Sequence, residues 1–462
     1  MNTPHARHAA ALALRPPRGA APTALAAALA ACFVAAAPPV QAAPPACAGT
    51  TTRSDRPTGS TDTVRALSTW LAARPAAELD APLLAPAEIA ALNGANAGRV
   101  GTWQDVLASA PRAPALVDAE LATRFEHLRE RVATGAWVEG QAGSLGRALE
   151  IARTSAPAAS HHLVVHPTDL RCVPEDAGLF TRPVDRDFDR NRCSVLHPGE
   201  LVRVERVSRD GRWRYVHAGH GVGWLRDAAL TPPLRPAEAR AFRDAPHRLA
   251  ALDDHLLTAG GFVLRLGVSL PVVGHADGFY QVQVPTLDGL ADDFLPDSAP
   301  VALAPQPLTR RAVLTLLFAR LGDVYGWGDT GGGRDCSRLL LDAFSTFGLR
   351  FGRHSGVIAE SGVRTVELGH LSAMDKRAAM RRADREGIVF LYMPGHIMLY
   401  LGEHEGRPYA LSALSEYLVP CPGGGDHTVR VDRVDVTTLE LGRGTARTSY
   451  LERLTRLAVL AP

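Results

Sequence analysis

The spacing of apolar residues changes twice along the chain, and each change predicts a different architecture. Residues 62–155 repeat apolar positions at helical spacing, which is typical of amphipathic helices. From about residue 160, short runs such as 201–207 alternate apolar and polar side chains between glycine turns, which predicts small antiparallel sheets. From Leu308 onward both periods occur, which predicts an α+β domain.

The first 60 residues contain two further segments, and together with the changes in spacing they define the expected domain boundaries. Residues 1–42 have arginines, then an apolar stretch, then the small-residue cleavage site Val40-Gln41-Ala42, which predicts export to the periplasm or beyond. The expected order is a signal peptide (1–42), a linker (43–60), an N-terminal helical module (61–155), a first small barrel (158–231), a second small barrel (232–305) and the α+β domain (306–462).

A rival processing site lies inside this leader. Residues 29–32, Leu-Ala-Ala-Cys, resemble a bacterial lipoprotein box, and lipidation of Cys32 would anchor the protein to a membrane. No other run is long and apolar enough to span a bilayer. The net charge of +2 is too balanced to indicate a nucleic-acid partner.

The remaining cysteines differ in their surroundings. Cys172 and Cys193 bracket a charged loop, and an oxidising compartment would permit a disulfide between them. Cys47 lies in the linker and Cys421 in a Gly/Pro loop, neither with an assigned partner. Neither C-x-x-C nor H-E-x-x-H spacing occurs, so the sequence predicts no metal site and no cofactor.

Cys336 is the candidate nucleophile. It follows a glycine-rich loop and Asp335, a natural N-cap, and it precedes an apolar run of helical spacing. The dipole and free amides at a helix N-terminus lower a thiol pKa, so we expect activation of Cys336. The alternative is a buried structural cysteine that happens to begin a helix.

His396 is the candidate base, because it opens a strand sixty residues after the cysteine. The strand is expected to form a hairpin that turns near residues 404–406 and places Ser412 roughly opposite His396. A base needs a third group to fix its tautomer, and Ser412 would orient the ring without supplying charge. Ser415 and Glu416 are fallback candidates for this role.

These residues resemble the NlpC/P60 family of cell-wall cysteine peptidases, in the branch with two SH3b-like barrels before the catalytic domain. The resemblance covers nearly all of the chain after the leader. The motifs that carry it are Tyr-Gly-Trp-Gly at 325–328, Asp-Cys-Ser at 335–337, Arg-His-Ser at 353–355, the segment 394–402 that begins Pro-Gly-His, the barrel residues 213–216 and 223–224, and the tail 439–457.

The resemblance implies a papain-like fold in which Cys336 attacks as nucleophile, His396 serves as base and Tyr325 assists the oxyanion hole. By the same similarity, Asp335, Ser337 and Ser355 would contact the substrate. Barrel residues would complete that pocket, with Tyr215 and His220 as candidates. The substrate would be peptidoglycan stem peptides or muropeptides, cleaved at the γ-D-glutamyl–diamino acid bond, with a free N-terminal L-Ala preferred.

Two departures from the family pattern keep other functions open. Ser412 stands where a third imidazole or amide is expected, and Ile358 stands where a glutamine often follows the Arg-x-Ser segment. One alternative is therefore a wall-binding protein whose catalytic triad has decayed. The other is a different thiol reaction on the same fold, such as an amidase or acyl transferase.

Overall fold

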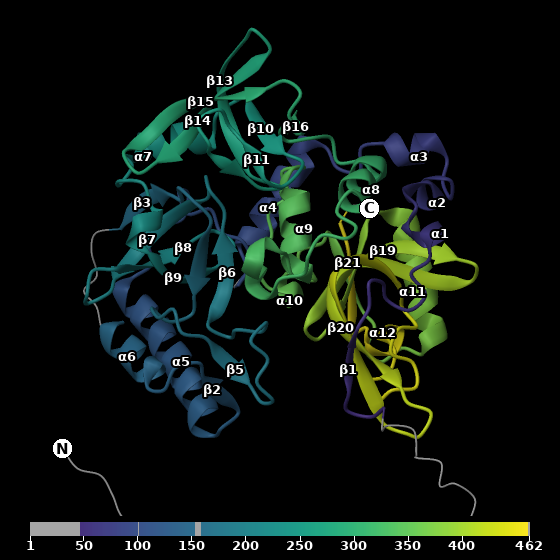
Figure 1. The fold of residues 1–462 in the computed structure, drawn as a ribbon. Helices are drawn as coiled ribbons and strands as arrows, with labels where there is room; N and C mark the ends of the chain where they lie inside the picture. The colour runs from purple at the N-terminus through teal and green to yellow at the C-terminus, as the bar shows by residue number, and fades with distance from the viewer. Residues whose placement is uncertain (1–46, 100, 153–158, 461–462) are drawn as a thin grey trace, which may run out of the picture. The chain divides into compact units, whose positions relative to one another are not determined.

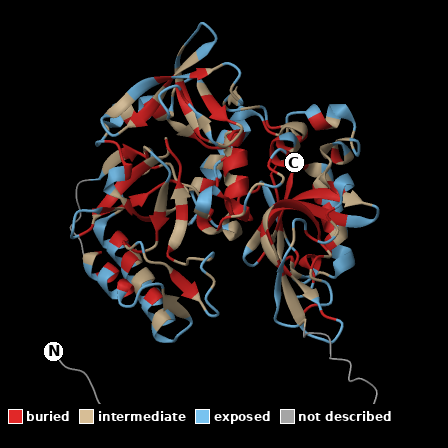
Figure 2. Ribbon diagram, viewed as in Figure 1, coloured by how far each residue is buried: buried red, intermediate tan, exposed pale blue. Residues whose placement is uncertain are grey.

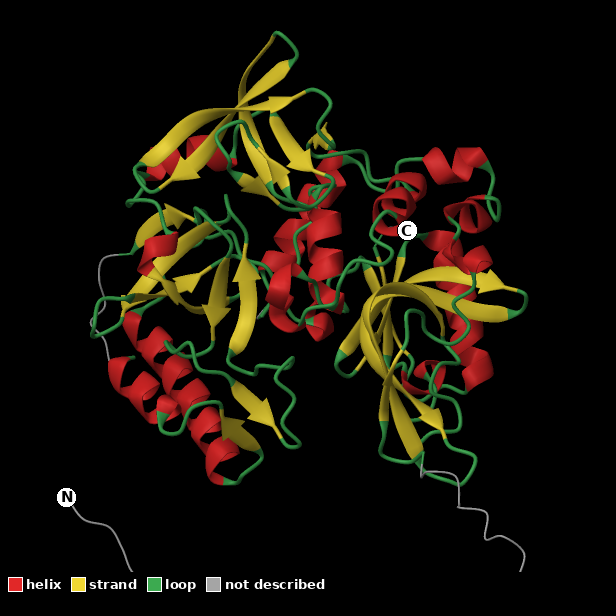
Figure 3. Ribbon diagram, viewed as in Figure 1, coloured by secondary structure: helices red, strands yellow, loops and turns green. Residues whose placement is uncertain are grey.

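The computed structural model describes residues 47–99, 101–152 and 159–460. The predicted leader, Cys32 and the first linker residues lie outside the described residues. Within the described ranges, no helix is long and apolar enough to cross a membrane. Figures 1 and 3 show helices and strands along the whole described chain, as an α+β class predicts.

A six-stranded sheet follows the helical region, in the order β3-β7-β8-β9-β4-β6. Its strands are antiparallel and short, as the alternating pattern predicts. A separate two-stranded pair joins the helical region to it. The strands are β3 (Ser160–Leu163), β4 (Thr168–Arg171), β6 (Arg192–Leu196), β7 (Leu201–Val207), β8 (Trp213–His217) and β9 (Val222–Arg226), with the pair β2 (Trp137–Glu139) and β5 (Leu179–Thr181) and the short 3₁₀-helix η1 (Asp227–Ala229).

The region predicted as a second barrel holds a five-stranded sheet in the order β15-β14-β13-β10-β16 and a separate two-stranded pair. One helix, α7 (Pro236–Arg243), precedes them. The strands are β10 (Arg248–Ala251), β13 (Ser269–Ala276), β14 (Phe279–Thr286), β15 (Gly289–Pro296) and β16 (Val301–Leu303), with the pair β11 (Leu256–Leu257) and β12 (Val263–Leu264).

The C-terminal region is built on a seven-stranded sheet in the order β1-β21-β20-β19-β18-β22-β17. Its strands are β1 (Thr51–Arg53), β17 (Arg364–Glu367), β18 (Val389–Met393), β19 (His396–His404), β20 (Arg407–Pro420), β21 (Asp426–Thr438) and β22 (Arg456–Val459). The helices are α8 (Arg310–Phe318), η2 (Trp327–Gly332), α9 (Cys336–Ser345), α10 (Ser355–Ile358), α11 (Ala373–Glu386) and α12 (Tyr450–Arg453).

Local sequence explains the elements that carry the site. The Thr309 side chain caps α8 and the Asp335 side chain caps α9, each by accepting a backbone N–H three residues on. The hairpin of β19 and β20 turns at Glu405 and Gly406, which both have positive φ, as tight hairpin turns require. The Asp335 cap and the position of the hairpin turn agree with the predictions.

The N-terminal helices do not form one module. Helices α1, α2 and α4 contribute Val64, Trp70 and Ile89 to the core of the C-terminal region, and α3 contacts α8, whereas α5 and α6 pack on the six-stranded sheet. The periodicity of 61–155 predicted the helices correctly but gave no information about their partners. The helices are α1 (Asp62–Arg65), α2 (Leu67–Leu71), α3 (Ala76–Asp80), α4 (Pro86–Ala97), α5 (Pro114–Ala133) and α6 (Ser144–Ile151).

The described part of the predicted linker is docked on the C-terminal sheet. Strand β1 pairs in parallel with β21, and a disulfide joins Cys47 to Cys421. The structure also contains the predicted Cys172–Cys193 disulfide. Residues 47–53 are therefore part of the folded domain, which corrects their assignment as linker.

Helix α9 lies at the centre of these contacts, and Figure 2 shows it almost entirely buried. On the side facing the six-stranded sheet, Arg338 donates to Asp342 at 2.7 Å and to Glu200 at 2.6 Å. Arg334, just before the helix, donates to Asp342 at 2.7 Å and also pairs with Asp254, which follows β10. Charged hydrogen bonds thus connect α9 to both preceding sheets.

Candidate active site

Cys336 is the first residue of α9 and the only free cysteine among the described residues. Its side chain is nearly covered, with 8% of the residue exposed. It lies in the same buried cluster as Ile397 of β19, and the backbone N–H groups of Ile397 and Ser337 favour its thiolate form. Because Ile397 directly follows His396 in β19, this contact brings the nucleophile and the base candidate to the same place.

Ser412 holds the ring of His396, as predicted. Its Oγ lies 3.1 Å from Nε2 of His396. The pairing of Leu399 with Leu411 continues to place Ser412 diagonally across from His396 on one face of the hairpin. Tyr450 also packs its ring edge-on against the imidazole, with ring centroids 5.8 Å apart. Nε2 is therefore occupied by Ser412, and Nδ1 is the nitrogen left to accept a thiol proton.

Burial controls the charge state of both groups. Burial, together with the nearby Asp335 carboxylate, raises the pKa of the Cys336 thiol to about 12. Burial lowers the pKa of His396 to about 4, and Arg453 adds to this effect. The expected lowering of the thiol pKa by the helix N-terminus was wrong for this state, because desolvation exceeds the stabilisation by the two backbone N–H groups. At neutral pH the pair is therefore an uncharged thiol and imidazole.

A buried ionic cluster lies directly before the nucleophile. Arg353 donates to both oxygens of Asp335, at 3.0 and 2.6 Å, and to Ser337 Oγ at 2.7 Å. It also contacts Asp329 at 3.3 Å. Burial raises the pKa of Asp329, and Asp335 adds to that effect. The cluster holds two carboxylates and one guanidinium.

The sequence-predicted substrate residues do not all meet at this place. Asp335 and Ser337 lie in the cluster, and Ser355 is half-buried at the start of α10, two residues after Arg353. Tyr215 is fully buried between the six-stranded sheet and α5, where its hydroxyl donates to Glu120 at 2.7 Å. Tyr215 is thus a core residue, and its assignment to the substrate pocket was wrong.

The remaining candidates have other partners. His220 contacts Glu200 at 3.0 Å, and its backbone oxygen accepts the N–H of Arg353, so it supports the cluster from the sheet side. Glu416 lies further along β20 and faces Arg447 at 3.8 Å. The phenol of the half-buried Tyr325 has a raised pKa, caused by desolvation and then by Asp335 and Cys336, so it remains a proton donor near the thiol.

A loop of the six-stranded sheet reaches over this region. Residues 182–191 join β5 to β6, and their backbone at Asp189 accepts the indole N–H of Trp327 at 3.0 Å. Phe188 packs against Tyr325 at 6.5 Å between centroids. Arg430 of β21 pairs with two aspartates of the same loop at 3.0 and 3.1 Å. Sequence reasoning missed this loop, although its aromatic and acidic residues between two strands were visible.

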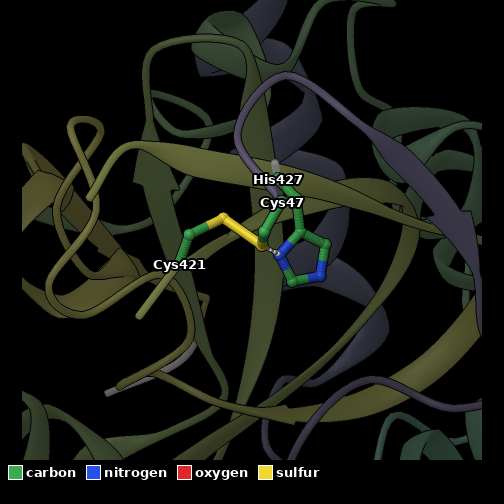
Figure 4. Close-up of side chains that lie close together, drawn as sticks. All are labelled: Cys47, Cys421 and His427. Carbon is green, nitrogen blue, oxygen red and sulfur yellow. Dashed lines mark hydrogen bonds between the residues drawn. A yellow bond between two sulfur atoms is a disulfide. The ribbon is translucent and has the colours of Figure 1, made fainter. Parts of the chain in front are cut away.

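One further group of potential metal ligands occurs among the described residues. Figure 4 shows Cys47 and Cys421 joined as a disulfide, with Nδ1 of His427 lying 3.3 Å from the Cys47 sulfur. Metal binding by cysteine requires thiolates, which a disulfide does not offer. In this state the two cysteines form a disulfide that cross-links the N-terminal segment to the loop between β20 and β21.

Comparisons with known proteins agree with this geometry. The sequence pattern of the SH3 domain (SH3b1 type) matches residues 179–226, which include β5 to β9 and the loop over the site. A solved NlpC/P60 endopeptidase from Photobacterium damselae subsp. piscicida superposes with a TM-score of 0.66 at 15% identity, covering 85% of this chain and 96% of that chain. The chain has the fold of an NlpC/P60 endopeptidase with an SH3b domain. We refer to the region from β5 to β9 as the SH3b domain below.

Other comparisons add little. The structures of NlpC2 and NlpC1 from Trichomonas vaginalis cover 62% and 64% of this chain and 97% and 96% of their own, at 13% and 14% identity. Their TM-scores of 0.23 are too low to guide interpretation. No curated protein sequence matches the chain. The expectation of an NlpC/P60 fold with an SH3b domain is confirmed at the level of the fold.

Proposed function

We propose that this protein is an exported cysteine endopeptidase that hydrolyses the γ-D-glutamyl–diamino acid bond of peptidoglycan stem peptides. The observation that carries the proposal is the constellation of Cys336 at a helix N-terminus and His396 oriented by Ser412. The NlpC/P60 fold and the SH3b domain support a wall peptide as the substrate class. Export rests on the leader pattern alone.

The neutral pair implies general-base catalysis rather than a preformed ion pair. Nδ1 of His396 takes the thiol proton as the Cys336 sulfur attacks the γ-glutamyl carbonyl. The tetrahedral oxyanion is held by backbone N–H groups at the start of α9 and by the Tyr325 hydroxyl. The imidazolium then protonates the leaving amine, a thioester remains on Cys336, and water deprotonated by His396 releases the glutamyl carboxylate.

The ionic cluster suits a substrate with a free amine. Asp329 and Asp335 share the single guanidinium of Arg353, so the ionised cluster carries one uncompensated negative charge beside the nucleophile. A substrate ammonium would compensate that charge in a site screened from water. The SH3b loop over Tyr325 and Trp327 limits the space, which favours short peptides over intact wall.

The test is incubation of the purified chain with L-Ala-γ-D-Glu-meso-diaminopimelate and with its N-acetylated form, read by mass spectrometry. We expect release of L-Ala-D-Glu from the free-amine peptide and little from the acetylated one. Cleavage of both peptides would contradict the amine preference. Cleavage at another bond would contradict the reaction. No cleavage of either by reduced, folded protein would favour a wall-binding protein without activity.

A further inference from the structure

A cavity of about 400 Å³ lies behind α9, away from the start of the helix where Cys336 sits. Its walls come from four parts of the chain: the loop after α4, the SH3b domain, the region of α7 to β13, and the C-terminal half of α9 with the segment after it. This volume is within the range of small-ligand sites in proteins. Neither the catalytic mechanism nor the substrate model above uses it.

Four carboxylates line this cavity, and each of them pairs with an arginine. Asp105 and Asp244 pair with Arg243, at the end of α7. Glu200 and Asp342 pair with Arg338 of α9. Glu200 also contacts the imidazole of His220. Asp342 also pairs with Arg334 and contacts the imidazole of His197. The four carboxylates are Asp105, Asp244, Glu200 and Asp342.

Two further arginines of the wall have no carboxylate partner among the described residues. Arg248 hydrogen-bonds only to neutral oxygens, including Ser269 Oγ at 3.1 Å. Arg350 is fixed through its backbone N–H, which donates to Asn93 Oδ1 at 2.8 Å, while its guanidinium makes no hydrogen bond or ion pair to the described residues. The side chain of Arg350 remains accessible to solvent through the open cavity.

Both guanidiniums line the same cavity, and the Asp244 carboxylate partly offsets the effect of its surroundings on the pKa of Arg248. Burial, followed by the charge of Arg350, lowers the pKa of Arg248 to about 10. Enclosure by the cavity walls lowers the pKa of Arg350; Asp105 and Glu200 oppose this effect, and Arg243 adds to it. Two like charges on the wall of one partly desolvated cavity are unfavourable, and an anion bound there would relieve the repulsion.

We propose that the cavity behind α9 is a binding site for a small oxyanion or dicarboxylate, held between Arg248 and Arg350. Arg350 suits this role because its guanidinium, without a partner among the described residues, can donate two parallel hydrogen bonds to carboxylate or phosphate oxygens. Arg248 has four of its five N–H groups bonded already and contributes mainly charge. The ligand would contact the SH3b domain, the region of α7 to β13 and α9 at once. Its binding would therefore stabilise the junction of these parts independently of catalysis.

Two sources offer the same chemistry: free phosphate and the carboxylates of wall-derived glutamate. The test is calorimetric titration of the full chain with inorganic phosphate and, separately, with D-glutamate. The decisive variant is Arg350→Gln, which keeps the backbone contact to Asn93 and changes a solvent-accessible side chain. The matched control is Arg382→Gln on α11, an exposed arginine with no ion pair to the described residues.

We expect one or both probes to bind the wild type and the Arg382→Gln variant equally. Arg350→Gln should weaken binding roughly 10- to 100-fold, the effect of losing a charge-assisted contact. The probe that binds identifies the source. The proposal is overturned if neither probe binds, or if Arg350→Gln binds as the wild type does, which would show an adventitious ion only. Peptide hydrolysis is not part of the readout, so failure here leaves the proposed activity untouched.

Discussion

The two sides of helix α9 differ in the charge of the side chains that they place. At its start, facing β19, Cys336 meets an imidazole and backbone amides, and both titratable groups are uncharged at neutral pH. On the side facing the preceding domains, Arg338 and Asp342 are fully ionised and joined to Glu200. The candidate thiol–imidazole pair is neutral, although the Arg353–Asp335 ion pair lies just before it, whereas the domain-facing side fixes position through charge.

This difference predicts that one side of α9 governs the stability of the fold and the other the rate of the reaction. Removing one member of a buried ion pair leaves an uncompensated charge, so the domain-facing side should govern stability. The catalytic groups make few strong contacts, so their loss should affect the reaction and leave the fold intact. Each prediction below tests whether the two sides can be separated in this way.

The largest effect is expected for Cys336→Ala. Loss of the nucleophile should reduce kcat/KM for the tripeptide by more than about 10³-fold, because a catalytic unit fails when its nucleophile is removed. The change removes one small buried atom, so the urea midpoint should shift little. Steady-state kinetics and urea unfolding measure both. A variant that keeps substantial activity would identify Cys336 as the structural cysteine of the alternative interpretation.

A large loss of stability is expected for Arg338→Met. The change leaves Glu200 and Asp342 without their shared guanidinium, which should cost about 3–5 kcal/mol in the free energy of unfolding. The matched control is Arg381→Met on α11, whose exposed pair with Glu403 at 3.0 Å should contribute less than about 1 kcal/mol. Urea unfolding compares the two variants. Equal losses in the free energy of unfolding would show that the domain-facing ion pairs contribute no more to stability than an exposed pair.

Sequence reasoning succeeded where the deciding contacts are local. The cap of α9 lies within three residues of the group it binds, and the β19–β20 hairpin turns at 405–406 as its sequence predicts. The contact of His396 with Ser412 also needs the β-bulge between Tyr400 and Gly402, which shifts the pairing by one residue and brings Ser412 to the face of His396. The turn chemistry predicted the hairpin but not the bulge.

It failed where the deciding contacts join distant segments. The Cys47–Cys421 disulfide spans 374 positions, and no spacing rule connects its ends. The thiol pKa was misjudged for the same reason: the helix terminus is a local feature, but the burial that outweighs it comes from strands about sixty residues away. Tyr215 was misplaced because a buried tyrosine and a ligand-binding tyrosine look alike in a strand.

The pH dependence distinguishes a neutral catalytic side from an ion pair. His396 must be unprotonated to act as base, and with a pKa of about 4 it stays so down to pH 5. Activity at pH 5 should therefore remain near its value at pH 7, whereas a base of ordinary pKa, about 6.5, would lose roughly 25-fold. Initial rates of kcat/KM between pH 4.5 and 8 measure this. Circular dichroism at each pH controls for unfolding.

The smallest effect is expected for Ser412→Ala, which removes the hydrogen bond to Nε2 of His396. Loss of one neutral hydrogen bond corresponds to about 1 kcal/mol, so kcat should fall roughly 5- to 10-fold with KM unchanged. The matched control is Ser415→Ala on the same strand, which should behave as the wild type. If Ser415→Ala is the slower enzyme, the orienting group has been misassigned. If Ser412→Ala lowers stability as strongly as Arg338→Met, the two sides of α9 are not separable.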